Sequence, residues 1–446
     1  MSTIVYDGTL PDGHPLHRLT PEQLDALGRE FQAVHDDVYA DLNDADAQYI
    51  RRMIRIQRSL AAGSRAVLVA SRFWPAWVLG TAGLGVAKIL ENMEIGHNVM
   101  HGQWDWMNDP YIHSSTWDWD TASPASAWKH SHNYLHHTYT NIVGKDKDVG
   151  YEILRVDDKQ PWEPRFLAQP IYNALLALLF EWGVAVHDLD IEAVSEGTKD
   201  PEELRQQGRE IVQKVLGQVL KDYFAWPAIS GVIMTLVEVG VIGLFDPASQ
   251  EVLPGESRPR RRVLGRRGRG LRSGNVVARL GRRRSFREPF RSTMTANIVA
   301  NLIRNVWAYA IIFCGHFPEQ AWTFTEEEVA DETQGGWYLR QLIGSVNIEG
   351  GPLFHIMSGN LSFQVEHHLY PDMPSSRYQQ IAPRVRAICE RYELPYNTGP
   401  FLKQVWSVQK KILRLAFPGR VDWPKPGPWR EPAVAEEPDA ALPAFP

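Results

Sequence analysis

Histidine residues are concentrated in clusters that lie far apart in the chain, and each cluster adjoins an apolar run. Within the first two clusters, pairs of histidines are four residues apart, a spacing that places both imidazoles on one face of a helix. In the second cluster a further histidine follows directly and projects about 100° round the helix. The clustered histidines are His97 and His101, then His132, His136 and His137, then His367 and His368, with His316 at the end of another apolar run.

Imidazole nitrogen is a good ligand for iron, copper, nickel and zinc. Two adjacent histidines that diverge from one helix can bind different metal ions, and clusters from distant parts of the chain can enclose a metal pair, as helical bundles do with carboxylates. The isolated His35, His113 and His187 are expected to be ordinary packed or interfacial residues, and His355 is open between packing and ligation. We therefore predict a two-metal centre formed by the clustered histidines.

Metal-binding imidazoles need hydrogen-bonding partners that fix their tautomer and orientation. Polar residues close to the clusters in the sequence are candidates for this role, and the alternative interpretation is that they are surface or helix-end charges. The candidates are Glu94, Asp146, Asp148, Asn360, Gln364 and Glu366.

Four apolar runs separate the clusters, at residues 66–90, 170–186, 223–245 and 296–315. A helix of about 20 residues crosses the hydrocarbon core of a bilayer, about 30 Å thick, and the last two runs satisfy this length. The first run contains Arg72 and Trp74-Pro75 and is expected to fold back on itself, near residues 80–83. The second run is short and contains Glu181, which suits an interfacial helix as well as a span.

All the clustered histidines must reach one side of the bilayer, which requires an even number of crossings between them. A fold-back of the first run and a hairpin of the last two satisfy this if the second run lies in the interface. Arginines before the first run predict a cytoplasmic N-terminus. They are Arg51, Arg52, Arg55, Arg58 and Arg65. The predicted fold is mainly α: an integral, multi-pass protein of the cell membrane whose cytoplasmic helical cap holds the metals.

Composition divides the chain into three parts. Residues 1–60 are polar and are predicted to be soluble and helical, with a helix start at Thr20-Pro21-Glu22-Gln23. Residues 61–418 form the predicted membrane domain, and the Pro-rich residues 419–446 are expected to be disordered. The net charge of −6 gives no sign of nucleic-acid binding, and the two distant cysteines indicate neither a disulfide framework nor a zinc site.

Residues 254–291 depart from the rest of the chain, because they contain fourteen Arg, no Lys and many Gly. Three interpretations are open: a patch that binds anionic lipid or nucleic acid, a disordered loop, and a reading-frame error in GC-rich DNA. The reading-frame error is favoured, since out-of-frame GC-rich codons yield Arg, Gly and Pro. The predicted hairpin also places this loop opposite the cytoplasm, where arginines are disfavoured.

The histidine spacing resembles the three boxes of the membrane fatty acid desaturase superfamily. The matching motifs are His97-x₃-His101, His132-x₃-His136-His137 and Gln364-x₂-His367-His368. The Gln that begins the third box resembles front-end members. Longer runs around the boxes, such as Trp128-Lys-His-Ser-His-Asn-Tyr-Leu-His-His, are similar to the mycobacterial NADPH-dependent stearoyl-CoA Δ9 members. The resemblance covers residues 20–245 and 290–415.

The resemblance implies an O₂-dependent acyl-CoA desaturase whose eight clustered histidines, His316 included, bind two iron ions. It also implies a long-chain acyl-CoA substrate, contact with membrane lipids and electrons from NADPH. The chain lacks the His-Pro-Gly-Gly motif of a fused cytochrome b5 domain. A separate membrane-associated oxidoreductase with flavin and an iron–sulfur cluster is therefore implied as the electron donor.

Removal of hydrogen from an unactivated CH₂ group is beyond any side-chain base and requires a metal that activates O₂. An apolar slot beside the metals must hold the acyl chain. The aromatic candidates for its wall are Trp104, Trp106, Tyr134 and Trp307, together with Trp117 and Trp119. A fatty acyl hydroxylase and an acyl-lipid desaturase share the boxes and are alternatives. A metal transporter or haem-binding protein is an alternative of another class, but a transporter would place its polar ligands mid-span rather than at the ends of apolar runs.

Overall fold

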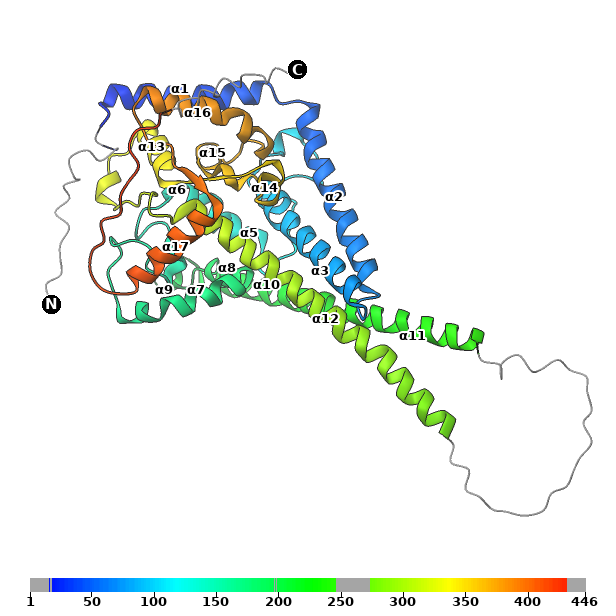
Figure 1. Cartoon of the computed structure of the whole chain (residues 1–446). Coiled ribbons are helices and arrows are strands. Elements are labelled where there is room, and N and C mark those ends of the chain that lie inside the picture. The colour runs from blue at the N-terminus through cyan, green and yellow to red at the C-terminus, as the bar shows by residue number, and fades with distance from the viewer. Residues whose placement is uncertain (1–15, 17, 196, 198, 246–272, 431–446) are drawn as a thin grey trace, which may run out of the picture.

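The structure is a computed structural model that describes residues 16, 18–195, 197, 199–245 and 273–430. It is almost entirely helical (Figure 1). The helices are α1 (Pro21–Ala40), α2 (Asp44–Leu68), α3 (Trp74–Ile89), α4 (Asn98–Met100), α5 (Ala125–Trp128), α6 (His137–Tyr139), α7 (Gln169–Leu178), α8 (Phe180–His187), α9 (Ile191–Ser195), α10 (Pro201–Val219), α11 (Trp226–Phe245), α12 (Ser273–His316), α13 (Gln334–Gly344), α14 (Pro352–Met357), α15 (Gln364–Leu369), α16 (Tyr378–Arg391) and α17 (Phe401–Leu415).

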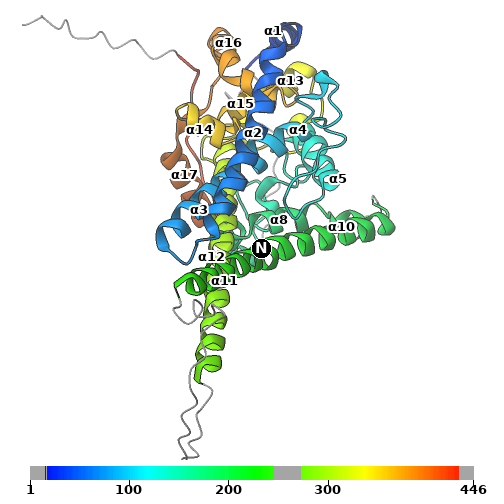
Figure 2. The same ribbon diagram turned by 90° about the vertical axis from the view of Figure 1, so that its right-hand side faces the viewer.

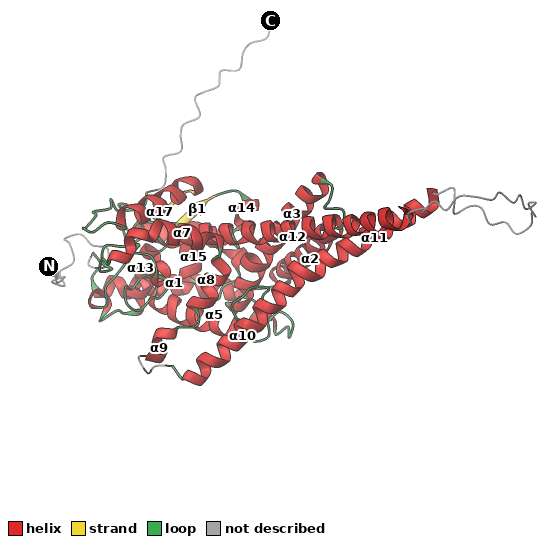
Figure 3. Ribbon diagram, turned by 90° about the horizontal axis from the view of Figure 1, so that it is seen from below, coloured by secondary structure: helices red, strands yellow, loops and turns green. Residues whose placement is uncertain are grey.

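Three further segments are wound as π-helices, in which hydrogen bonds join residues i and i+5. They are η2 (Leu90–His97), η4 (Lys129–His136) and η7 (Leu220–Ala225). Two short strands, β1 (Asn347–Glu349) and β2 (Thr398–Pro400), pair in parallel. The view from below shows this small sheet among the helices (Figure 3).

The helices form two regions. At one end α1, α13, α15 and α16 lie together, and we call this group the cap (Figure 1). The longer α2, α3, α11 and α12 run away from the cap, and α10 lies across the molecule near the start of α11 (Figure 2). The clustered histidines come from segments that meet where these regions join.

The first helix begins at the predicted position and is part of the cap. The Thr20 hydroxyl accepts a hydrogen bond from the Gln23 amide at 3.3 Å, and the Gln23 side chain accepts one from the Thr20 amide at 2.9 Å. This reciprocal pair is a capping box, which satisfies two free donors at the helix start. Helix α1 then buries Leu27 and Phe31 in the same core as Val385 of α16, so the N-terminal region packs onto the C-terminal part of the chain.

The first apolar run does fold back, but not at the predicted place. Helices α2 and α3 form a packed hairpin whose turn spans residues 69–73, whereas α3 continues through residues 80–83. A side chain at Gly80 would place its Cβ 2.7 Å from Cγ of Leu68. The glycines of this run therefore allow close packing of α3 on α2 rather than a bend.

The second apolar run is broken into two short helices. Residue Leu179, at φ −112° and ψ 28°, separates α7 from α8, and each of the two is too short to span a bilayer. Large side chains on this run point outward, including Ile171, Leu175 and Val186, which are 63%, 51% and 60% exposed. This arrangement suits the interfacial alternative.

By length and composition, one helical stretch among the described residues could cross a membrane, Ser285–His316 of α12. Helix α11 packs beside α12. Residues 273–291 of the Arg-rich stretch form the first part of α12, so the interpretation of the whole stretch as a loop is wrong for this part. Residues 254–272 lie outside the described residues.

Candidate metal centre

All eight clustered histidines come together where η2, η4, α12 and α15 meet. The first cluster lies at the end of η2 and directly after α4, and the second covers the end of η4 and the start of α6. His316 ends α12, and α15 carries the last two. Seven of the eight are at most 9% exposed, and the side chain of His132 is 15% exposed. Distant parts of the chain thus enclose one buried cluster of imidazoles.

Among the described residues, three sets of candidate ligand atoms lie within 4.8 Å of one another: two groups consist of ring nitrogens alone, and the third set joins His132 and His136 to Asp148. The first group is His97, His101, His132 and His367, and the second is His136, His316 and His368. The ring of His137 lies between them, with its centroid 4.9 Å from that of His367 and 4.6 Å from that of His368. Two groups of nitrogen donors with a shared neighbour can hold two metal ions.

In both clusters the two histidines four residues apart lie side by side, as predicted, but the second cluster is not α-helical. The amide of His101 donates to the carbonyl of His97 as in an α-helix, and their rings are 4.6 Å apart. In the π-helical η4, the ring of His132 is 5.0 Å from His136 and 5.1 Å from His137. The α-helical geometry expected for this cluster is therefore wrong, because the wider π turn brings His137 round beside His132.

Unpaired nitrogen atoms in this cluster fit metal ligation. The buried Nε2 atoms without a hydrogen-bond partner among the described residues include those of His101, His132, His136, His137 and His367. A buried polar atom left without a partner costs about 1–3 kcal/mol, which a metal ion bound to the nitrogen would offset.

The protonation state of the histidine rings is also consistent with metal ligation. Burial and the neighbouring imidazole of His132 lower the pKa of His97 to about 3. Burial and the surrounding histidines hold the pKa of His101 and His367 well below the usual histidine value. These rings are neutral at physiological pH, as metal ligation requires.

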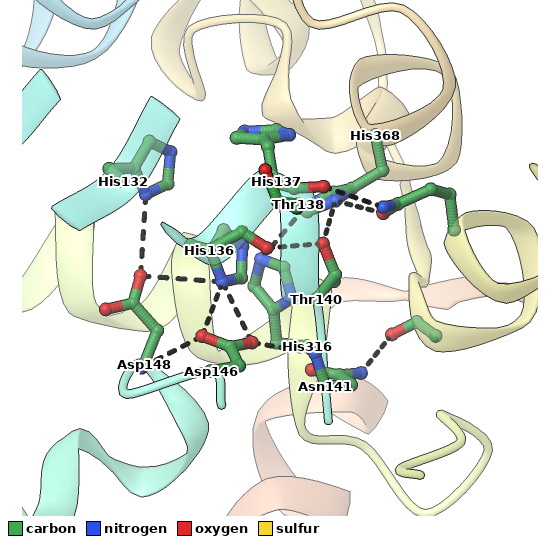
Figure 4. A network of polar contacts seen from close by, with 12 residues as sticks. His132, His136, His137, Thr138, Thr140, Asn141, Asp146, Asp148, His316 and His368 are labelled. Atoms are coloured by element: carbon green, nitrogen blue, oxygen red, sulfur yellow. Dashed lines mark hydrogen bonds and ion pairs between the residues drawn. The ribbon is translucent and has the colours of Figure 1, made fainter. Parts of the chain in front are cut away.

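Two carboxylates, Asp148 and Asp146, contact His132 and His136 of the second cluster (Figure 4). The Asp146 oxygens lie 3.0 and 3.1 Å from Nδ1 of His136. Oδ2 of Asp148 lies 3.4 Å from Nδ1 of His132. Burial raises the pKa of Asp148, but hydrogen bonds from His132 and His187 outweigh it and hold that pKa well below the usual range. An ionised carboxylate at Nδ1 leaves Nε2 free as a ligand atom.

Three further side chains that local sequence did not single out contact this network. The Tyr378 hydroxyl is 3.2 Å from Nδ1 of His367, and Oε1 of Gln341 is 3.0 Å from Nδ1 of His368. Both belong to cap helices far away in the sequence. His187, expected to be an ordinary packed residue, instead places Nε2 2.9 Å from Asp148.

The other predicted partners differ in their positions. Nε2 of Gln364 is 2.9 Å from Nε2 of His316, so it reaches the second group. Glu94 and Asn360 bond to each other at 3.0 Å rather than to a clustered histidine. Glu366 accepts hydrogen bonds from the side chains of a β1 residue and of a tyrosine before β2. These three residues brace the segments that carry the histidines.

Comparison with known proteins places this arrangement in a family. The family model for fatty acid desaturases matches residues 72–243 and 290–400. An NADPH-dependent stearoyl-CoA 9-desaturase from Mycobacterium tuberculosis is 43% identical over 402 residues, which cover 90% of this chain and 82% of that protein. The chain belongs to the fatty acid desaturase family. The predicted resemblance is thereby confirmed.

More distant desaturases match only part of the chain. Fatty acid desaturase 3 of Bos taurus is 34% identical over 87 residues, 20% of each chain. An acyl-lipid (9-3)-desaturase of Borago officinalis is 35% identical over 92 residues, 21% of this chain and 20% of that protein. No solved structure matches the chain.

The family match is interrupted between residues 243 and 290. The Arg-rich stretch, 254–291, falls almost wholly in this interruption, in keeping with its unusual composition. Its origin as a reading-frame error stays a prediction, which translation of the other frames of the gene tests.

A narrow cavity adjoins the histidines of this desaturase, and its free internal volume is about 60 Å³, smaller than that of a typical ligand pocket. His97, His132 and His316 form part of its wall. Apolar side chains form much of the rest, namely Met93, Trp119, Trp128, Tyr151, Phe180, Val184, Ala308, Ile312 and Leu361. An apolar cavity beside the metal centre is the feature that an acyl chain requires.

The aromatic residues first expected in this wall lie elsewhere, Trp119 excepted. The cavity wall contains none of the other expected aromatic residues, which are Trp104, Trp106, Trp117, Tyr134 and Trp307. Trp104 is fully buried in a separate core, and Tyr134 is 56% exposed. Trp307 is on α12, but the cavity face of that helix carries Ala308, and adjacent helical residues point about 100° apart. Trp307 instead packs on Phe354.

Proposed function

We propose that this desaturase uses O₂ to introduce a cis double bond at the Δ9 position of a long-chain acyl-CoA, with stearoyl-CoA as the preferred substrate. The observation that carries the proposal is the pair of imidazole groups beside an apolar cavity. The relative that is similar over 90% of the chain bears the name of a stearoyl-CoA 9-desaturase, which supports the same substrate class.

We propose that the eight clustered histidines hold two iron ions, one in each group, with His137 available to either. Two irons bound there would supply the O₂-dependent chemistry that removes hydrogen from an unactivated CH₂ group. All-nitrogen ligation from four separate segments would hold both ions beside the cavity. Asp146 and Asp148 contact Nδ1 of His136 and His132, which would leave the Nε2 atoms of both rings as ligand atoms.

The protein's own part in the reaction is to orient the acyl chain and exclude water. The apolar side chains of the cavity wall, Trp128 and Ile312 among them, can contact a methylene chain, whereas the polar groups of the wall include Asp148 and Asp188. A chain held along this wall lies beside His97 and His316, one from each group. Fixed geometry of this kind restricts which methylene pair is positioned for oxidation.

We propose that the protein is embedded in the cell membrane with its metal centre on the cytoplasmic side. The apolar α12 and outward-facing side chains on neighbouring helices support this, because large exposed apolar surfaces mark contact with lipid or protein. These side chains include Leu79 on α3, Ile171 on α7 and Leu236 on α11, which are 68%, 63% and 66% exposed. NADPH would donate electrons through a separate oxidoreductase that contains flavin and an iron–sulfur cluster.

Metal analysis of the purified protein tests the proposal. We expect two iron ions per chain in the wild type. In His136→Ala we expect the iron content to be halved or lost, and desaturase activity to be lost with it. The matched control is His355→Ala, since His355 bonds to Ser362 and belongs to neither group. Zinc or no metal in the wild type would contradict the proposal. Lipid products with hydroxyl groups, or double bonds formed only in phospholipid-bound chains, would favour the hydroxylase or acyl-lipid alternatives.

A further inference from the structure

The cavity beside the metal centre has two chemically different ends. Elements η2, α8 and α12 each run along it from the far end to the metal end. Their residues at the far end are Asn92, Glu181 and Arg304, and those at the metal end are His97, His187 and His316. An α-helix rises 1.5 Å per residue, so α12 extends about 18 Å from His316 to Arg304.

A buried ion pair forms the far end. Arg304 pairs through Nη2 with Glu181, and the two residues are 1% and 7% exposed. Nε of Arg304 donates to Oδ1 of Asn305 at 3.0 Å, and Nε2 of Gln218 donates to Glu181 at 2.8 Å. Nη1 of Arg304 has no hydrogen-bond partner among the described residues. Two charges are therefore held at the far end of the cavity, whose apolar wall residues include Ala308 and Ile312.

Such charges are costly at this position. Arg304 lies within the stretch of α12 that could cross a membrane, and ionisable residues in such segments are rare and usually functional. Breaking a buried ion pair by separating its partners is strongly unfavourable. A methyl group pressed against the pair would also cover the free Nη1 donor without offering it an acceptor. An acyl chain therefore cannot extend past the ion pair without a large cost in free energy.

We propose that the Arg304–Glu181 pair is the closed end of the acyl slot and sets the length of chain that fits beyond the metal centre. This inference rests on the proposed desaturase function. The terminal methyl group of the substrate points toward Arg304, and Ala308 and Ile312 line the path that it follows along α12. Chains that extend past the pair are excluded.

The first experiment shortens the slot with Ala308→Leu, which adds bulk to its wall two turns from His316. We expect the turnover of stearoyl-CoA relative to palmitoyl-CoA to fall roughly tenfold or more, the usual effect of a few misplaced methylenes in a pocket. The control is Ala300→Leu, a buried alanine on the same helix that lies outside the cavity wall. It should leave the ratio unchanged, and an unchanged ratio in Ala308→Leu overturns the proposal.

The second experiment removes the charges together with Glu181→Gln/Arg304→Met, which leaves no unpaired buried charge. We expect this variant to bind and desaturate behenoyl-CoA and the wild type to reject it. The matched control is Arg72→Met/Glu238→Gln, an ion pair away from the cavity. Equilibrium binding of the saturated acyl-CoA series without reductase gives a readout independent of turnover. Retained rejection of behenoyl-CoA contradicts the inference, whereas a wild type that desaturates no acyl-CoA contradicts the proposed function itself.

Discussion

Nδ1 of His136 lies 3.0 Å from Oδ2 of Asp146, and both side chains are at most 4% exposed. The same carboxylate also accepts hydrogen bonds from the backbone amides of Asn141 and Asp148 at 2.7 and 3.0 Å. Asp146 therefore fixes the ring of a proposed ligand and the loop that carries its other carboxylate partner.

Asp146→Asn should weaken metal binding or activity by about 10- to 100-fold, the usual effect of removing a partner of a metal ligand. An amide has one acceptor oxygen and cannot accept from all three donors, so at least one hydrogen bond is lost. Iron content and desaturase activity measure the effect. Asp37→Asn, which alters an exposed ion pair with Arg384, is the control. Full activity in Asp146→Asn would show that this carboxylate does not position His136.

Tyr378→Phe should reduce both stability and iron content. The Tyr378 hydroxyl donates to the carbonyl of Tyr370 at 3.1 Å and contacts Nδ1 of His367 at 3.2 Å. Loss of a buried hydrogen-bonding group costs about 1–3 kcal/mol. Tyr370→Phe is the comparison, because its hydroxyl bonds to the carbonyl of Phe31, away from the histidines. Both variants should melt earlier, and only Tyr378→Phe should lose iron; equal iron loss would assign Tyr378 a purely structural role.

The stability of the cap should depend on pH through His35. The hydrogen bond from His35 to Asp372, 3.2 Å long, raises the pKa of His35. A raised pKa means that the folded state binds the proton more tightly, so the stabilisation is fully present below the unfolded value, about 6.5, and is lost as the pH rises through the folded value. The melting temperature, measured by thermal unfolding across this pH range, should no longer depend on pH in this way in His35→Gln. An unaltered pH profile would assign the dependence to other groups.

Gly335→Ala should destabilise the cap by about 1–3 kcal/mol, the cost of an overpacked core. A Cβ at Gly335 would collide with the backbone carbonyl of Leu24 in α1, whereas one at the neighbouring Gly336 would meet the side chains of Glu332 at 3.2 Å and Thr333 at 3.7 Å. Gly336→Ala should therefore be neutral or stabilising, since Ala favours helix over Gly by about 1 kcal/mol. Denaturant unfolding of both variants checks the difference, and equal effects would contradict close contact between α1 and α13.

Iron should stabilise the folded protein by mass action, because a ligand that binds only the folded state raises the melting temperature. Addition of Fe²⁺ to metal-free protein should raise the melting temperature of the wild type and of His355→Ala. The rise should be smaller in His367→Ala, which removes a nitrogen from the first group. A similar rise in all three would place the iron elsewhere.

The sequence predicted the parts of this centre that are local and missed those that are not. Spacing and type identified all eight histidines and the two nearby carboxylates, because these signals lie within single segments. Gln341 and Tyr378 approach the histidines only through the packing of the cap, which no local pattern encodes. The π winding of η4 was also missed, since a hydrogen-bond shift of one residue leaves composition unchanged.

The fold-back of the first run was misplaced for a related reason. The sequence predicts a fold-back near residues 80–83, whereas the packed structure uses Gly80 for close contact between helices. Helix boundaries with local signals were easier, as the capping box at Thr20 demonstrates.

The closeness of His97 and His367, whose rings are 5.0 Å apart, constrains the order of events during synthesis. Contacts between residues so distant along the chain form late, because loop closure must precede them. The first group is complete only after α15, which carries His367, has been synthesised. Most of the polypeptide therefore exists before the fourth imidazole of this group is present. A metal ion that requires all four nitrogens of the first group can therefore bind only after most of the chain has been synthesised.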